Sequence, residues 1–132
     1  TTVANLDNTG VNGVYLTSEG KRGDAAWGTR GRWCNLTGRV GDEPVSITIL
    51  DHPGNPGFPT YWHARGYGLF AVNPLGQKIF SNGKEELNLS VAPHQSITFR
   101  YRVLISPEIV SPGKSEAEYK KFSEETAGRP KS

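Results

Sequence analysis

Residues 36–50 read Leu36-Thr37-Gly38-Arg39-Val40-Gly41-Asp42-Glu43-Pro44-Val45-Ser46-Ile47-Thr48-Ile49-Leu50. From Val45 onward, aliphatic side chains alternate with hydroxyl side chains, which is the period-two pattern of a strand with one buried face. Between the two runs, Gly41-Asp42 has the composition of a tight turn. The stretch therefore predicts an antiparallel hairpin, and it assigns the chain to the β class.

Further β-prone runs lie on both sides of this hairpin. Upstream, residues 11–16 and 32–37 are short strand candidates, separated by a Gly-rich, charged stretch that is typical of a loop. Downstream, residues 86–91 and 96–105 alternate around turn residues 92–95, which predicts a second hairpin. These runs predict one mainly β domain over residues 1–132, an antiparallel β-sandwich of the jelly-roll or supersandwich type.

The C-terminal region alone has the pattern of a helix. Residues 111–114 are turn-like, and Ser115 with Glu118 has the spacing of a capping box. Tyr119 and Phe122 lie three positions apart, so they would share one helix face and dock on the sheet. We therefore expect one short C-terminal helix that begins at Ser115 and ends before the Gly-Arg-Pro at 128–130.

Composition and charge exclude some classes of protein. The 132 residues include 15 Lys and Arg against 13 Asp and Glu, without the basic cluster that binding to a phosphate backbone requires. No apolar run approaches the roughly 18–20 residues of a membrane helix. We expect no nucleic-acid partner and no membrane span. The single cysteine, Cys34, cannot form an intrachain disulfide, and we expect it to be buried and inert.

The segment from Asp51 to Gly76 departs from the strand pattern. Residues 51–60 hold three prolines and two glycines, which predicts an irregular loop. The run Tyr61–Phe70 follows directly, and period two would place Tyr61, His63, Arg65 and Tyr67 on one face. Such a face suits sugar rings, because aromatic side chains stack on CH groups while polar side chains hydrogen-bond hydroxyls.

These residue types suggest roles for individual side chains. We expect His63 to act as a general acid or base and Arg65 to bind an oxyanion or hydroxyl, with Asp51 as the third catalytic candidate. The substrate-binding candidates are His52, Asn55, Trp62, Tyr67 and Asn73.

Purely structural roles for the same residues are the alternative. Trp62 and Phe70 would then fill the core, Arg65 would pair with Asp51, and His63 would be structural. We expect no cofactor, although a Zn or Cu site at His52, His63 and His94, with Asp51 near it, is a further alternative. No GxSxG elbow supports a serine triad.

At these positions the chain resembles a known family. The matching motifs are Trp27-Gly28, Arg32-Trp33-Cys34, Asp51-His52-Pro53-Gly54-Asn55-Pro56, Pro59–Arg65, Tyr67–Phe70 and Asn73-Pro74-Leu75-Gly76. They resemble a bacterial family of unknown function that carries the label "methane oxygenase PmoA-like", over about Trp27 to Tyr119. The resemblance implies a sandwich-like protein that is secreted or periplasmic and longer than this chain.

The resemblance also shapes the expected function. The chain begins Thr1-Thr2-Val3 without Met and looks like the C-terminal half of a family member, so we expect an excised segment whose N-terminal half would be a partner. The label transfers no chemistry, because a methane oxygenase would be a membrane complex. The polysaccharide-degrading context that the resemblance implies indicates carbohydrate.

The expected function is therefore that of a soluble carbohydrate-active protein, an enzyme acting on a sugar or glycoside. The alternatives are a non-catalytic carbohydrate-binding or accessory module, or a mononuclear metal protein. By resemblance, the positions that carry the function are Asp51, His52, Asn55, Trp62, His63, Arg65 and Tyr67.

Overall fold

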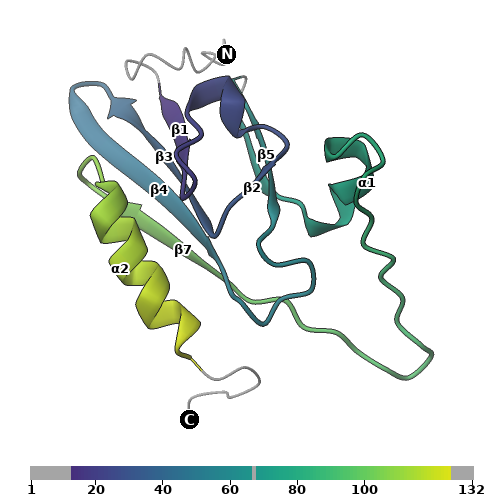
Figure 1. Cartoon of the computed structure of the whole chain (residues 1–132). Helices are drawn as coiled ribbons and strands as arrows, with labels where there is room; N and C mark the ends of the chain where they lie inside the picture. Colours follow the sequence, from purple (N-terminus) through teal and green to yellow (C-terminus); the bar gives the residue numbers. More distant parts are fainter. Residues whose placement is uncertain (1–12, 67, 126–132) are drawn as a thin grey trace.

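The computed structural model describes residues 13–66 and 68–125, which form two antiparallel sheets packed together (Figure 1). The larger sheet has the order β1-β3-β4-β7 and the smaller one β2-β5-β6. Their strands are β1 (Val14–Thr17), β2 (Thr29–Arg30), β3 (Trp33–Val40), β4 (Glu43–Asp51), β5 (Tyr61–Arg65), β6 (Leu69–Val72) and β7 (Tyr101–Ser106). The helical segments are η1 (Gly23–Ala26), η2 (Pro74–Gly76), α1 (Gln77–Phe80) and α2 (Pro112–Ser123). The expected mainly β, two-sheet architecture with a C-terminal helix is confirmed.

The hairpin predicted for residues 36–50 is the centre of the larger sheet. Strands β3 and β4 pair along their full length, with Leu36 opposite Ile47 and Val40 opposite Glu43. The turn is Gly41-Asp42, and Gly41 has a φ of 63°. A residue with a side chain is strained at that angle, whereas glycine adopts it freely.

The main core lies between the two sheets. Tyr15, Cys34, Trp62 and Ala64 are fully buried there, and half-buried aliphatic and aromatic side chains of both sheets pack around them. Burial raises the pKa of the Cys34 thiol, which confirms the expected buried cysteine. Because Trp62 and Ala64 of β5 point into this core, the alternate residues of β5 lie on the outer face of the smaller sheet.

Helix α2 covers the opposite face of the larger sheet, as predicted. Phe122 is buried against Trp33 and Leu50, and Tyr119 packs beside them. The predicted start of this helix is wrong by one turn. Ser111 is the N-cap and accepts a hydrogen bond from the Lys114 amide, with Pro at the first helical position. Proline is common at the first helical position because it has no backbone N–H that would be left unpaired there.

Ser115, which the sequence suggested as the cap, has a different role. It lies inside the helix and is 1% exposed, and its hydroxyl donates to the side-chain oxygen of Asn35 on β3 at 2.8 Å. The same oxygen accepts from Thr48. The serine therefore fastens the helix to the sheet.

Replacing Ser111 with Ala is expected to lower the free energy of unfolding by about 1 kcal/mol, because the Lys114 amide loses its cap. Chemical denaturation measures this change. Ser123→Ala is the matched control at the other end of α2, where the change should stay within about 0.5 kcal/mol. Equal effects at both serines would contradict the assignment of the cap.

The second predicted hairpin is wrong. Residues 101–106 form β7, but their partner is β4, with Ile105 opposite Ile47 and Val103 opposite Ile49. Residues 86–91 form no strand and belong to a long loop that runs out from α1 and returns to β7 (Figure 1). The turn at its tip exists, with the Gln95 amide donating to the Ala92 carbonyl. Alternation predicts a strand-forming segment, whereas the choice of partner depends on apolar contacts between distant residues.

Candidate functional site

The loop that begins at Asp51 is held by a buried hydrogen-bond network. The Asn55 side-chain amide donates to Asp51 at 2.7 Å and to the Arg100 carbonyl at 2.6 Å, and its oxygen accepts from the Arg100 amide at 2.7 Å. The other Asp51 oxygen accepts from the Thr60 amide at 3.0 Å. Asp51 is 1% and Asn55 5% exposed. Both side chains therefore hold the loop against the segment that leads into β7.

His52 belongs to the same structural unit. The Gly54 amide donates to Nδ1 at 3.0 Å, so Nε2 carries the proton and donates to the Glu125 carbonyl at 2.9 Å. The ring is 4% exposed and lies edge-on to Phe122, with ring centroids 5.1 Å apart. Since both nitrogens are occupied inside the protein, we leave His52, Asp51 and Asn55 out of the proposed site.

Asp51 is the acidic residue of this network, and its pKa is shifted. Burial raises the pKa of its carboxyl from 3.8 to about 6, although the hydrogen bonds from Asn55 and Thr60 act in the opposite direction. Burial, and then the charge of Asp51, raise the pKa of Tyr101 to about 12. Both shifts describe groups that are partly removed from water.

A second group of predicted residues lies on the outer face of the smaller sheet. As period two predicts, Tyr61, His63 and Arg65 lie on the face of β5 opposite Trp62 and Ala64. The Arg65 guanidinium lies over the ring of Trp27, 4.2 Å from its centroid. The alternative in which Arg65 pairs with Asp51 is therefore wrong, because the two groups have different partners.

Trp27 and Phe80 complete this surface. The His63 ring lies edge-on to both, with centroid distances of 6.4 Å and 5.4 Å, and Trp27 and Phe80 are 5.2 Å apart. Gly28 turns the chain after Trp27 with a φ of 68°, and a side-chain carbon added there would touch Phe80. We call these four residues, Trp27, His63, Arg65 and Phe80, the Trp27 surface.

Polar groups on the Trp27 surface lack protein partners. Within residues 13–66 and 68–125, no hydrogen bond reaches the half-buried His63 ring, and no carboxylate pairs with Arg65. The Trp27 indole N–H is buried and also lacks an acceptor among these residues. The half-buried side chains of His63 and Arg65 therefore offer hydrogen-bond donors that a ligand can use.

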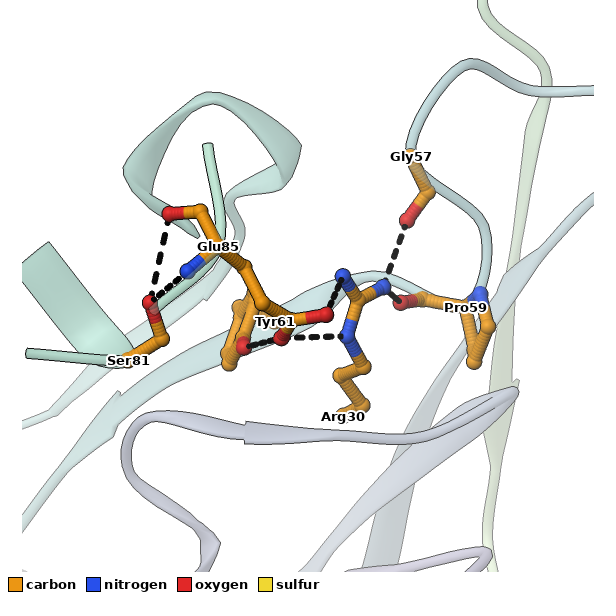
Figure 2. Close-up of polar contacts among 6 residues, drawn as sticks. All are labelled: Arg30, Gly57, Pro59, Tyr61, Ser81 and Glu85. Atoms are coloured by element: carbon orange, nitrogen blue, oxygen red, sulfur yellow. Dashed lines mark hydrogen bonds and ion pairs between the residues drawn. The ribbon is translucent and has the colours of Figure 1, made fainter. Parts of the chain in front are cut away.

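Beside this surface, a network of Arg30, Tyr61 and Glu85 joins the loop after α1 to the smaller sheet. Figure 2 shows the Arg30 guanidinium between the Glu85 carboxylate and the backbone carbonyls of Gly57 and Pro59. The Tyr61 hydroxyl donates to the same carboxylate. Tyr61 and then Arg30 hold the pKa of Glu85 below its ordinary value. Every charged group of this network thus has a partner within it.

The remaining predicted site residues are dispersed. Trp62 is 0% exposed in the core, and its indole N–H donates to the Gly31 carbonyl at 3.0 Å, so a surface ligand does not reach it. Asn73 follows β6, and its backbone N–H donates to the Tyr61 carbonyl. His94 is exposed at the tip of the long loop, and Tyr67 lies outside the described residues. The three histidines are not brought together, and no group of three His, Cys, Asp or Glu in the described part could hold a metal.

Four residues of this region were not predicted from the pattern of the sequence. Trp27 appeared only as part of the family resemblance, and Arg30, Phe80 and Glu85 carried no motif at all. Their contacts to β5 join segments far apart in the chain, so periodicity within one strand could not reveal them.

The fold and the Trp27 surface define a class: a β-sandwich-like protein with an aromatic, cationic surface outside its smaller sheet. The model of a family of unknown function, DUF6807, matches residues 3–120, and the chain belongs to that family. No match was found among curated proteins or among solved structures. No helix of the described residues has the length and apolar character to cross a membrane.

Proposed function

We propose that the Trp27 surface binds carbohydrate. The observation that carries this proposal is that the half-buried side chains of His63 and Arg65 lie against the rings of Trp27 and Phe80 without a hydrogen-bond or ion-pair partner among residues 13–66 and 68–125. Sugar hydroxyls and ring oxygens accept hydrogen bonds from such donors, while aromatic rings pack against sugar CH groups. Strand β5 carries His63 and Arg65, and their contacts with the rings of Trp27 and Phe80 orient them before the ligand arrives, which lowers the entropic cost of binding.

A binding role is favoured over glycoside hydrolysis by the partners that Glu85 and Asp51 already have within the protein. Most glycosidases use a pair of carboxyl groups, one of them as a proton donor. Glu85 accepts from Arg30 and Tyr61, and these contacts keep its pKa low. Asp51 is buried and hydrogen-bonded to Asn55 and Thr60. We therefore rank a non-catalytic binding module above an enzyme in which His63 acts as general acid or base.

Replacing His63 with Ala is expected to weaken glycan binding about fivefold to tenfold, the value of one lost hydrogen bond with its packing. Affinity gel electrophoresis in a panel of neutral and acidic polysaccharides measures the effect. The matched control is His94→Ala, because that histidine is exposed on the distant loop. Its affinity should stay unchanged.

The same panel separates binding from turnover. Native protein whose migration is slowed by a polysaccharide in the gel, but which releases no reducing ends from it, fits a binding module. Release of reducing ends that His63→Ala abolishes would favour the enzyme instead. If the native protein binds none of the glycans, the proposal fails.

A further inference from the structure

We infer that the ligand of the Trp27 surface carries a carboxylate, as a uronic acid does; this inference rests on the proposed function. It comes from a comparison of arginines within the same molecule. Four arginines of the described part lie over aromatic rings, and three of them share a second feature. The four pairs are Arg30 on Tyr61, Arg32 on Tyr119, Arg65 on Trp27 and Arg102 on Phe122.

Three of these stacked arginines also hold a carboxylate. Arg30 pairs with Glu85 at 3.0 Å, Arg32 with Glu116 at 2.9 Å and Arg102 with Glu125 at 2.5 Å. In each case the ring packs against the guanidinium while an N–H group donates to the glutamate. This combination satisfies both the flat surface and the charge of a guanidinium.

Arg65 is the exception among the four. It lies on Trp27 at 4.2 Å, the shortest of the four arginine-to-ring distances, yet no Asp or Glu of the described residues pairs with it. Stacking sets the plane of its guanidinium, so the N–H groups at its edge are oriented for a bidentate contact. A ligand carboxylate would complete the arrangement that the other three arginines make within the chain.

The neighbours of Arg65 agree with an anionic ligand. The half-buried His63 ring has no hydrogen-bond partner in the described part, and Glu85 in the network beside this surface is neutralised by Arg30. One guanidinium matches the single charge of a carboxylate. The pyranose ring attached to that carboxylate would then lie against the adjoining rings of Trp27 and Phe80.

The test compares oligosaccharides that differ only in the carboxylate. Oligomers of galacturonic, glucuronic and mannuronic acid, each with its carboxyl-reduced neutral counterpart, are titrated into the full chain by calorimetry at one ionic strength. Constant salt matters because a protein with a net charge of +2 attracts any polyanion weakly. At least one acidic oligomer should bind about tenfold or more tightly than its reduced counterpart.

Arg65→Met keeps the aliphatic stem on Trp27 and removes the charge. In this variant the acidic oligomer should bind no better than the reduced one. Arg39→Met is the matched control, because Arg39 lies in the β3–β4 turn region and donates only to the Asp42 carbonyl among the described residues. Its preference for the acidic oligomer should be unchanged, and the melting temperatures of both variants report whether they fold.

The outcomes separate the two proposals. If neither acidic nor reduced oligomers bind, carbohydrate binding itself fails. Equal binding of both forms, or a preference that survives Arg65→Met, overturns the carboxylate while leaving the carbohydrate surface intact.

Discussion

Replacing Asn55 with Ala is expected to lower the free energy of unfolding by about 3 kcal/mol. The change removes three hydrogen bonds and leaves the Arg100 amide, the Arg100 carbonyl and one Asp51 oxygen without their partner in a site that is 5% exposed at Asn55. Each buried polar group that loses its partner costs about 1–3 kcal/mol, and the three losses share one relaxing loop. Urea denaturation at constant pH measures the change.

Asn88→Ala is the matched control, since Asn88 is exposed on the long loop and its replacement should change stability by less than about 0.5 kcal/mol. Asn55→Asp is a second probe. It puts a carboxylate oxygen where the amide nitrogen donates to Asp51 and Arg100, so it should destabilise the protein as well. Native-like stability of Asn55→Ala would show that this network does not hold the loop.

The Asp51 carboxyl is expected to make the folded state less stable as pH rises from about 4 to about 6. Its pKa is about 6 in the folded protein against an ordinary 3.8, so the folded state binds the proton more tightly than the unfolded state does. The stabilisation is therefore complete below pH 4 and is lost as pH rises through 6. At about 1.4 kcal/mol per pKa unit, the contribution of this group changes by about 3 kcal/mol.

Asp51→Asn isolates this contribution, because the amide does not titrate. The variant is itself destabilised, since an amide has one acceptor where Asp51 accepts from both Asn55 and Thr60. The stability difference between native protein and variant should be largest near pH 4 and should shrink by about 3 kcal/mol above pH 7. Denaturation curves at six pH values supply the profile. A difference that does not vary with pH would mean that burial leaves the Asp51 pKa near its ordinary value.

Local pattern in the sequence predicted much of the fold. Alternation at residues 45–50 and the Gly41-Asp42 turn identified the central hairpin, and period two correctly placed His63 and Arg65 on one face of β5. The docking of Phe122 also followed from spacing on a helix. These features depend on neighbours in the chain, which is why a pattern within a few residues predicts them.

The candidate site was predicted only in part, and the reason lies in burial. The sequence grouped Asp51, His52 and Asn55 with His63 and Arg65, because all five are polar residues in an unusual stretch. The structure separates them: the first three are buried in a loop network, and the last two lie on the Trp27 surface. A polar side chain serves structure or a ligand according to whether the protein supplies its partner, and residue type does not reveal this.

The sequence by itself determined the β class, the central hairpin, the shared face of β5 and membership of a family of unknown function. Tertiary structure alone decided that β7 pairs with β4, that Glu85 neutralises Arg30, and that Arg65 lies on Trp27 with no carboxylate partner in the described part of the chain. The physical reason is the range of the interactions. Alternation and turns are local, whereas strand pairing, burial and ion pairing join residues that only the folded chain brings together.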